Sequence, residues 1–307
     1  MRIANSLDEL KHATKSVVLA AGVFDGVHLG HRAVIETAIA DAKQRGGEAW
    51  ALTFDPHPQR ILQPQSAPPM LTSTSHKLML LAQTGLDGCV VQPFTKELAA
   101  LEPEAFIDFL RDSVPNHAAL VVGFNFNFGK RARGDTTMLR EIGIARGFTV
   151  HVVPGVQWNG AGISSTRIRN AVSDGKLDEA AAMLGRPFSI FGKVVKGKQL
   201  GRQLGFPTAN VLPDNEVRPP PGSYAVRART GGKLYNAAAY VGHRDRGFGP
   251  EIEVHLLDQS LDLYGAEMEV SFIQLIRPDE QFDTLDALKT QIGKDVEATH
   301  RAFAIAR

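Results

Sequence analysis

A chain of 307 residues is longer than one hydrophobic core usually serves, so its length favours two domains. The formal net charge of +1 gives no reason to expect a nucleic-acid partner, and no apolar run approaches the roughly 20 residues that cross a bilayer. The N-terminal residues lack the apolar core of a secretory signal, and the single cysteine, Cys89, excludes an internal disulfide. We therefore expect a cytoplasmic globular protein with no membrane and no nucleic-acid partner.

Strand and helix patterns alternate along the first half of the chain. Apolar runs predict strands at residues 16–21, 49–54, 86–94, 118–124 and 148–154. Helical spacing of apolar residues occurs over residues 35–42, 104–114 and 136–147, and it returns from Ser165 onward and over residues 177–184. Strands that alternate with helices favour a parallel sheet covered by helices on both faces.

The second half has a different pattern, with short β-rich segments separated by Gly, Pro and Asp. These segments cover residues 188–197, 223–229, 234–242, 251–258 and 267–276. Their even spacing favours a small barrel or sandwich. From Thr284 the pattern becomes helical, with Leu285, Leu288, Ile292 and Val296 on one face that should pack against the strands. We place the domain boundary near residue 186, which gives domains 1–186 and 187–307.

The stretch GVFDGVHLGH, residues 22–31, lies between the first predicted strand and the first predicted helix. Ligands of open parallel sheets gather at such strand ends, and the free N–H groups of the following helix attract anions. Gly26 and Gly30 allow a tight turn, and His28 and His31 can donate hydrogen bonds to phosphate oxygens. Two alternatives stay open: a metal site, for which two histidines supply at most two ligands, and a polar turn with incidental histidines.

Four motifs follow one another in the first domain. Residues 28–31 read H-x-G-H, TFDPHP spans 53–58, VVGFNFNFGKRARGD spans 121–135, and GISSTRIR spans 162–169. Together they resemble the prokaryotic bifunctional riboflavin kinase/FMN adenylyltransferase family, often called FAD synthetase, and the resemblance covers nearly the whole chain. It implies a Rossmann-like nucleotidyltransferase domain with a parallel sheet, followed by a small riboflavin-kinase-type β-barrel with a terminal helix.

The resemblance also implies roles for individual residues of the first domain. His28 and His31 would be catalytic, as donors that stabilise charge in the transition state. ATP or phosphate binding is implied for Gly22, Phe24, Asp25, Gly30, Ser164, Ser165, Thr166 and Arg169, and contact with FMN is implied for His57, Asn125 and Arg133. The structural alternatives are a plain helix cap, a solvated basic loop and a turn shaped by prolines. Many family members carry Asp where this chain has Asn125.

A glycine-rich run, KGKQLGRQLGFPTANV, spans residues 196–211 of the second domain. Gly197, Gly201 and Gly205 permit close backbone approach to a phosphate, although a glycine-rich hairpin would explain the same residues. The run contains G-F-P-T-A-N, which resembles the riboflavin kinase signature. That resemblance implies that Thr208 helps to hold Mg²⁺ with the ATP phosphates and that Asn210 lies in the same site.

Glu253 matches the catalytic glutamate of the family, which accepts the proton of the riboflavin 5′-hydroxyl. Strand alternation places Glu253, His255 and Leu257 on one face, and an outward, solvated Glu253 is the alternative. One segment departs from the family pattern: residues 241–251 read VGHRDRGFGPE where G-x-R-P-T-F is usual.

The motifs in both halves predict an enzyme that phosphorylates riboflavin to FMN and adenylylates FMN to FAD. ATP, riboflavin, FMN and FAD are its expected small-molecule partners, Mg²⁺ is expected with ATP, and the flavins are substrates and products instead of a prosthetic group. One alternative is a monofunctional FMN adenylyltransferase whose barrel only binds flavin, which the unusual residues 241–251 favour. A second alternative is a regulatory protein that binds nucleotide or flavin without activity.

Overall fold

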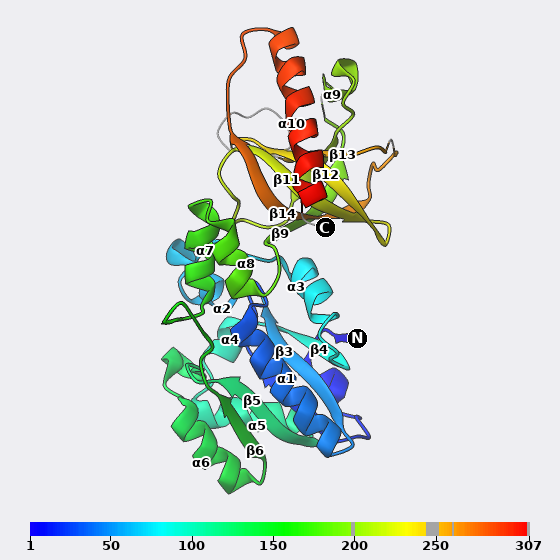
Figure 1. The fold of residues 1–307 in the computed structure, drawn as a ribbon. Coiled ribbons are helices and arrows are strands. Elements are labelled where there is room, and N and C mark those ends of the chain that lie inside the picture. Colours follow the sequence, from blue (N-terminus) through cyan, green and yellow to red (C-terminus); the bar gives the residue numbers. More distant parts are fainter. Residues whose placement is uncertain (198–199, 244–251, 260, 306–307) are drawn as a thin grey trace. The chain divides into compact units, whose positions relative to one another are not determined.

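The computed structural model describes residues 1–197, 200–243, 252–259 and 261–305. They form two compact units (Figure 1). The first unit contains residues 1–69 and 74–164, and the second contains residues 70–73 and the chain from Ser165 onward. The chain therefore enters the second unit twice, first for a short segment and then for its whole C-terminal half.

A six-stranded sheet forms the centre of the first unit (Figure 1). In spatial order its strands are β1 (Arg2–Ala4), β4 (Gly88–Pro93), β3 (Glu48–Asp55), β2 (Val17–Ala21), β5 (His117–Gly123) and β6 (Thr149–Val153). All neighbouring strands run parallel. The predicted Rossmann-like sheet is confirmed, and the sequence patterns miss only the short edge strand β1.

Helices connect these strands. They are α1 (Leu29–Gln44), α2 (Pro58–Leu62), α3 (Thr74–Leu81), α4 (Lys96–Ala99), α5 (Pro103–Ser113) and α6 (Thr136–Arg146). Short 3₁₀ turns occur at η1 (Leu7–Leu10), η2 (Pro64–Ser66) and η3 (Lys130–Ala132), and a small hairpin of β7 (Gln157–Trp158) and β8 (Ala161–Gly162) follows β6. The sequence patterns do not predict α3, which carries a residue important for the argument below.

The central strands are mainly apolar because both faces of the sheet are covered. Val18 and Ala20 of β2 pack with Ile35 of α1 in one buried cluster. Leu19 of β2 packs with Ile107 of α5 in the cluster on the other face. All of these side chains are fully buried, so β2 is a rigid support for the loop that follows it.

The order of the strands determines where that loop lies. From β2 the chain builds outward through β3 and β4, and it then returns to the other side of β2 for β5 and β6. The direction of winding thus changes between β2 and β5. Ligands of open α/β sheets bind beyond the carboxyl ends of the strands at such a switch point, and the loop from Gly22 to His28 leaves the carboxyl end of β2.

The second unit contains a closed barrel of six antiparallel strands, as predicted. In spatial order they are β10 (Ala209–Pro213), β13 (Ile252–Leu256), β12 (Lys233–Val241), β11 (Gly222–Thr230), β14 (Glu267–Pro278) and β9 (Ser189–Val195). Two further helices are α9 (Leu200–Leu204) and α10 (Leu285–Ile305). α10 packs along β11, β12 and β14 (Figure 1). Of the predicted packing face, Leu288, Ile292 and Val296 are half-buried, whereas Leu285, the first residue of the helix, is 58% exposed.

A pair of helices precedes the barrel, α7 (Ser165–Ser173) and α8 (Leu177–Leu184). Their contacts group them with the second unit, so the compact units divide between Ser164 and Ser165. The boundary at residue 186 describes functional domains, and it stays a prediction. The two divisions differ by residues 70–73 and by the α7–α8 pair, whose two helices pack against each other.

A four-residue segment from the first half of the chain completes the second unit. The backbone N–H groups of Glu216 and Val217 donate to the carbonyl oxygen of Met70 at 3.1 and 3.2 Å. The carboxylate of Glu216 accepts from the N–H of Met70 at 2.8 Å, and the side-chain amide of Asn215 donates to the carbonyl of Leu71. These bonds tie residues 70–73 to the second unit although about 90 residues of the first unit follow them in sequence.

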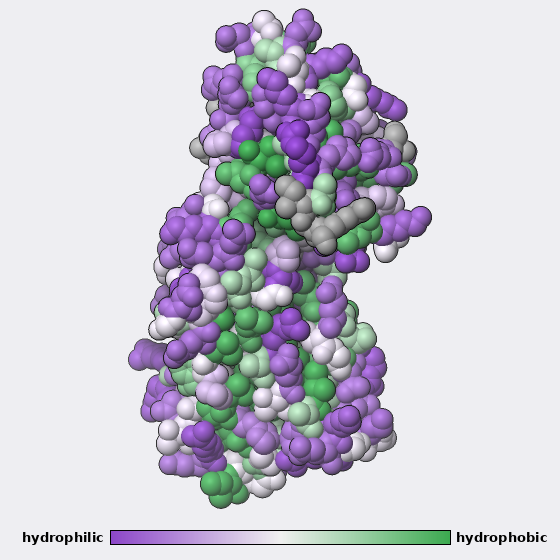
Figure 2. Space-filling view, viewed as in Figure 1, coloured by the Kyte–Doolittle hydropathy of each residue, from purple (hydrophilic) through white to green (hydrophobic). Residues whose placement is uncertain are grey.

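Hydrophilic side chains predominate on the face shown in the space-filling view, with apolar side chains in patches between them (Figure 2). Such mixing is usual on the surface of globular proteins. Within the described ranges, no helix combines the length and the apolar character needed to cross a membrane.

Asn215 provides a test of the segment's contribution to stability. Its side chain is 1% exposed, and its Oδ1 accepts from the backbone N–H of Phe191 at 2.8 Å while its Nδ2 donates to Leu71. Asn215→Ala leaves two buried backbone groups without these partners, so the free energy of unfolding should fall by about 2–4 kcal/mol. Urea unfolding followed by circular dichroism measures it, because both tryptophans lie in the first unit.

The matched control is Asn236→Ala, at an exposed position of β12. We expect a change within about 0.5 kcal/mol for this variant. Equal stability of the two variants would contradict the structural role given to residues 70–73.

Candidate functional sites

Residues 22–28, which we call the H-x-G-H loop, join β2 to α1, and the rest of the H-x-G-H stretch begins α1. Phe24 and Val27 have φ angles of 55° and 42°, in the left-handed region that L side chains rarely adopt. Gly26, with φ 83°, occupies the same region without steric cost. Non-glycine residues in this region cost on the order of 1–3 kcal/mol each, and they persist where neighbouring contacts hold them, commonly at functional sites.

His28 precedes the first turn of α1, and its ring caps the helix. The ring Nδ1 accepts a hydrogen bond from the backbone N–H of His31 at 3.2 Å. A neutral imidazole carries one N–H, so an accepting Nδ1 assigns the proton to Nε2. Nε2 of His28 is therefore a hydrogen-bond donor at the start of a helix, where the helix dipole also favours an anion.

The rings of His28 and His31 stack, with centroids 3.6 Å apart and planes inclined by 15°. The stack explains the glycine between them, because a Cβ at Gly30 would lie 3.1 Å from Cε1 of His28. The edge of the Phe24 ring contacts His31 at a centroid distance of 5.4 Å, and a Cβ at Gly22 would lie 3.1 Å from the same ring. The Phe24 side chain is 1% exposed, so it supports the histidine pair from within the core.

Three further predicted residues lie on loops of the first unit. Asp25 is buried in the H-x-G-H loop. His57 caps the five-residue helix α2, where its Nδ1 accepts from the backbone N–H of Gln59 at 3.1 Å. Asn125 follows β5 and is exposed. Asn125 and the H-x-G-H loop thus follow adjacent strands of the sheet, on either side of the switch point.

The basic loop after β5 is partly neutralised. Arg133 donates to the carboxylate of Glu102 at 3.0 Å, and Nζ of Lys130 lies 3.2 Å from the other oxygen of that carboxylate. Both cations are exposed, so each pair contributes at most about 1 kcal/mol. In the structure, the Arg133 and Lys130 side chains are thus both paired with Glu102.

The GISSTRIR motif opens helix α7, as predicted. Ser164 is the last residue of the first unit, and Ser165, Thr166 and Arg169 lie on α7 in the second unit. Thr166 and Arg169 are three residues apart and therefore lie on neighbouring positions of one helix face. Arg169 is 9% exposed.

Strand register arranges a row of polar side chains across the barrel. Asn210 of β10 is paired with Glu253 of β13, which is paired with Tyr240 of β12. Tyr240 is paired in turn with Ser223 of β11, and Ser223 with Arg277 of β14. Directly paired residues point to the same face of a sheet, so these five residues form one belt, which we call the polar belt.

Four members of the polar belt, Ser223, Tyr240, Glu253 and Arg277, line a cavity of about 290 Å³. Thr208 and residues of α9 and α10 line it as well. The Thr208 hydroxyl donates to a carboxylate oxygen of Glu253 at 3.1 Å. The fold therefore brings Thr208 and Glu253 into contact, and Asn210 on the adjacent strand is paired with Glu253.

Glu253 is half-buried on the cavity side of β13, where His255 also lies and where Nδ1 of His255 is 2.8 Å from the carbonyl oxygen of Pro207. Leu257, predicted on the same face, lies beyond the end of the strand at Leu256. The alternation of β13 thus holds for the two residues that matter at the cavity.

Glycines allow the G-F-P-T-A-N run to fold over this site. A Cβ at Gly197 would lie 2.4 Å from the side chain of Asn210, and one at Gly201 would lie 2.5 Å from the carbonyl oxygen of Phe206. Gly205 adopts φ 93°, which favours glycine. The unusual stretch after Val241 includes residues 244–251, which lie outside the described residues.

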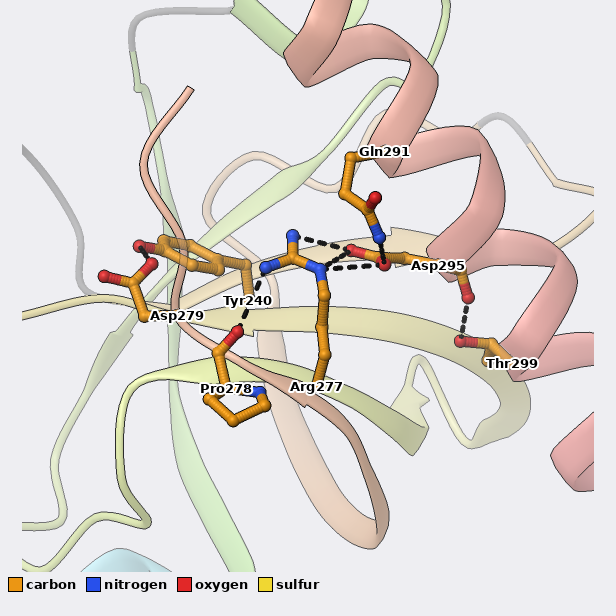
Figure 3. Close-up of polar contacts among 7 residues, drawn as sticks. All are labelled: Tyr240, Arg277, Pro278, Asp279, Gln291, Asp295 and Thr299. Carbon is orange, nitrogen blue, oxygen red and sulfur yellow. Dashed lines mark hydrogen bonds and ion pairs between the residues drawn. The ribbon is translucent and has the colours of Figure 1, made fainter. Parts of the chain in front are cut away.

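A network of polar contacts fixes α10 against the barrel beside the cavity (Figure 3). The guanidinium of Arg277 donates to both carboxylate oxygens of Asp295, at 3.0 and 2.9 Å. Gln291 donates to the same carboxylate at 2.8 Å, and the Thr299 hydroxyl donates to the backbone carbonyl of Asp295 at 2.8 Å. The Arg277 and Asp295 side chains are 17% and 8% exposed, so the pair is largely shielded from water. Sequence patterns do not single out these residues.

Nearby, the carboxylate of Asp279 accepts a hydrogen bond from the Tyr240 hydroxyl at 2.7 Å (Figure 3). Nε2 of His243 lies 3.0 Å from its other oxygen. Asp279 directly follows β14, at the start of the segment that leads to α10. These contacts therefore attach that segment to the end of β12.

The fold class is now defined: a Rossmann-like parallel α/β unit and a six-stranded barrel unit with a terminal helix. The chain matches the FAD synthetase family over residues 10–167 and the riboflavin kinase family over residues 184–303. The chain belongs to the bifunctional riboflavin kinase/FMN adenylyltransferase family, as the motifs predict.

Individual relatives agree with this assignment. The chain is 37% identical over 307 residues to the bifunctional riboflavin kinase/FMN adenylyltransferase of Escherichia coli (strain K12), which covers 99% of this chain and 98% of the relative. It is 35% identical to that of Bacillus subtilis (strain 168), over 97% and 96% of the two chains. A crystal structure described as a macrolide-efflux protein from Streptococcus pneumoniae aligns with a TM-score of 0.84 at 29% identity, over 97% of this chain and 98% of that one.

We expect the protein to lose stability when the negative charge of Asp295 is removed from the Arg277–Asp295 pair. Asp295→Asn leaves a largely buried guanidinium without its anion, so the free energy of unfolding should fall by about 3 kcal/mol. Urea unfolding followed by circular dichroism measures this change.

The control is Glu297→Gln on the same helix, where the pair with Arg301 is exposed and 3.9 Å long. We expect this variant to differ from the unmodified protein by at most about 0.5 kcal/mol. A similar small change for Asp295→Asn would show that the pair does not hold α10.

Proposed function

We propose that this chain makes FAD in two ATP-dependent steps, one for each family that it matches. Riboflavin and ATP give FMN and ADP at the barrel cavity, and FMN and ATP give FAD and pyrophosphate at the histidine pair. The observation that carries the proposal is that each unit has its own set of polar groups. These are the stacked rings of His28 and His31 in one unit and the contact between Thr208 and Glu253 in the other.

In the adenylyl-transfer step, a phosphate oxygen of FMN attacks the α-phosphorus of ATP. The bond between that phosphorus and the oxygen bridging to the β-phosphate breaks, and pyrophosphate leaves with the electron pair. No covalent intermediate on the protein is required. In this proposal Nε2–H of His28 and the first N–H groups of α1 stabilise the charge that grows on the phosphate oxygens, as preorganised donors do, and the cap formed by Nδ1 of His28 supports this role. His31 is proposed as the second donor to the phosphate oxygens, and its ring stacks on that of His28.

The other predicted residues of the first domain have supporting roles in this proposal. Ser164, Ser165, Thr166 and Arg169 bind the ATP phosphates, for which hydroxyl groups and a guanidinium are suitable donors. The backbone of Gly22, Phe24, Asp25 and Gly30 forms the turn that approaches the nucleotide. The predicted FMN contacts are His57, Asn125 and Arg133. The exposed position of Asn125 after β5 supports its assignment.

In the phosphoryl-transfer step, Glu253 accepts the proton of the riboflavin 5′-hydroxyl. The hydroxyl oxygen then attacks the γ-phosphorus of ATP, whose bond to the bridging oxygen breaks, and ADP leaves. The polar belt supports this assignment, because Glu253 faces the cavity between Asn210 and Tyr240. The backbone at Gly197, Gly201 and Gly205 is predicted to lie against the ATP phosphates, as in other glycine-rich loops.

A magnesium ion is expected with ATP in this step. Asn210 and Glu253 offer amide and carboxylate oxygens on adjacent strands, and Thr208, directly before β10, offers a hydroxyl. These are the hard oxygen donors that Mg²⁺ prefers. No cluster of three or more His, Cys, Asp or Glu side chains that could hold a metal occurs among the described residues, which suits a metal held mainly by substrate phosphates. Thr208 and Asn210 would hold the ion, which neutralises phosphate charge when bound.

The proposal includes functional domains 1–186 and 187–307, and ATP, riboflavin, FMN and FAD as small-molecule partners. A cytoplasmic location is part of it, supported by a single buried cysteine, Cys89, in a chain without disulfides. The alternative function is an FMN adenylyltransferase whose barrel binds flavin without kinase activity. The departure at residues 241–251 favours that alternative, whereas the intact Thr208 and Glu253 contact favours two activities.

A variant of His28 should affect FAD formation but not FMN formation. His28→Ala removes the Nε2 donor, so the turnover number for FAD formation from FMN should fall by about 10²–10³-fold or more. FMN formation from riboflavin should remain near its original rate, because the kinase groups lie in the other unit. Chromatographic separation of FMN and FAD measures both rates in one sample.

His28→Asn serves as the matched variant, since Asn caps helices well but has no group equivalent to Nε2. It should lose FAD formation to a similar extent. Equal loss of both products in a folded His28 variant would contradict the division of the two reactions.

A variant of Glu253 tests the proposed kinase reaction. Glu253→Gln keeps an oxygen that can accept from Thr208 but removes the proton acceptor, so FMN formation should slow by about 10²–10⁴-fold. Formation of FAD from supplied FMN should be unchanged. Glu267→Gln, at the exposed start of β14, is the control and should leave both rates unaltered. Unchanged FMN formation in Glu253→Gln would remove Glu253 from the reaction.

A further inference from the structure

One lysine is buried beneath the H-x-G-H loop. Lys77, on α3, is 2% exposed, and its Nζ donates to the carbonyl oxygen of Val23 at 3.1 Å and to the hydroxyl of Thr53 at 3.0 Å. The Thr53 hydroxyl donates in turn to the same carbonyl of Val23 at 2.9 Å. The three groups form a closed triangle, in which the hydroxyl both accepts and donates. We call it the Val23 triangle.

The Val23 triangle lies where the loop is most strained. Val23 directly precedes Phe24, the first residue of the loop with a left-handed backbone, and Val27, three residues after Phe24, is the second non-glycine residue in that region. Such conformations persist only when surrounding contacts determine them. Two buried donors from different elements, β3 and α3, fix the carbonyl at the beginning of this strained stretch.

The charge of Lys77 also connects two parts of the predicted site. Burial lowers the pKa of Lys77, whereas the carboxylates of Asp25 and Asp55 act in the opposite direction. Asp25 belongs to the H-x-G-H loop, and Asp55 ends β3 within the TFDPHP motif. A buried ammonium group is costly unless nearby groups compensate for it. The influence of both carboxylates on the pKa of Lys77 shows that the H-x-G-H loop and the end of β3 lie within electrostatic range of its side chain.

We infer that Lys77 is a positioning residue for adenylyl transfer, which holds the loop from Gly22 to His28 in the shape that aims Nε2 of His28 at the nucleotide. This inference rests on the function proposed for the histidine pair. Lys77 acts through Val23 and Thr53 and has no assigned contact with substrate. Its effect should therefore appear in the rate of the chemical step, because small displacements of catalytic groups reduce that rate.

The test replaces Lys77 by methionine, which has a similar length but neither charge nor donors. For FAD formation from FMN, kcat should fall by about 10- to 100-fold in Lys77→Met, with a smaller change in KM for ATP. FMN formation from riboflavin should be unchanged in the same sample. Lys43→Met, at an exposed position of α1, is the matched control and should retain both rates. Circular dichroism confirms that each variant is folded.

A second variant keeps the test decisive if Lys77→Met does not fold. Thr53→Val removes the bridging hydroxyl with little change of volume, and kcat for FAD formation should fall in the same sense. In the folded double variant, the loss should be smaller than the product of the two single losses, because both changes break one triangle. A purely structural role would lower the folded fraction without a change in kcat per folded molecule.

The inference is overturned if folded Lys77→Met, or folded Thr53→Val, forms FAD with kcat within about twofold of the unmodified chain, since a tenfold loss corresponds to the smallest displacement effect expected. His28→Ala is measured alongside. FAD formation that survives His28→Ala contradicts the proposed function. Loss in His28→Ala together with full activity in Lys77→Met contradicts only the role of Lys77.

Discussion

The hydrogen bond from the backbone N–H of His31 to Nδ1 of His28 determines the geometry of the first site. This single bond caps α1, assigns the remaining ring proton of neutral His28 to Nε2, and brings the two imidazoles into a stack. A Cβ at Gly30 would lie 3.1 Å from the ring of His28, which is a tight contact, so the stacked arrangement favours glycine at this position. The strained loop before it is tolerated because β2 is rigid and buried on both faces. The H-x-G-H stretch thus forms a helix start whose cap is the histidine that we propose as a hydrogen-bond donor to the phosphate oxygens.

In the barrel, polar side chains are positioned by strand register instead of by a helix cap. Closure of six strands fixes their register, and the register alone aligns Asn210, Glu253 and Tyr240 across three strands. The Arg277–Asp295 pair then holds α10 over this belt, so the cavity has one wall of strands and one of helix. In both units a rigid element presents the polar groups, which agrees with preorganised donors and bases as the main source of catalysis.

Much of this could be predicted from sequence, and the failures have physical reasons. The strands β2, β3 and β5 are buried on both faces, so they appear as continuous apolar runs. His28, Thr208 and Glu253 can be predicted as site residues because their motifs are local. Lys77 and the polar belt are not local: the role of Lys77 depends on where α3 packs, and the belt depends on pairings between distant strands. Nor does a local pattern show that residues 70–73 belong to the second unit, since the bonds to Asn215 and Glu216 span about 145 positions in sequence.

The most direct test of the account is a time course with the unmodified chain, riboflavin, ATP and Mg²⁺, in which FMN and FAD are separated by chromatography. Two active sites predict that FMN appears first and that FAD follows at its expense. Conversion of supplied FMN to FAD without any product from riboflavin would contradict the account and select the monofunctional alternative. The absence of both products, from riboflavin and from FMN, would contradict enzymatic function in either unit.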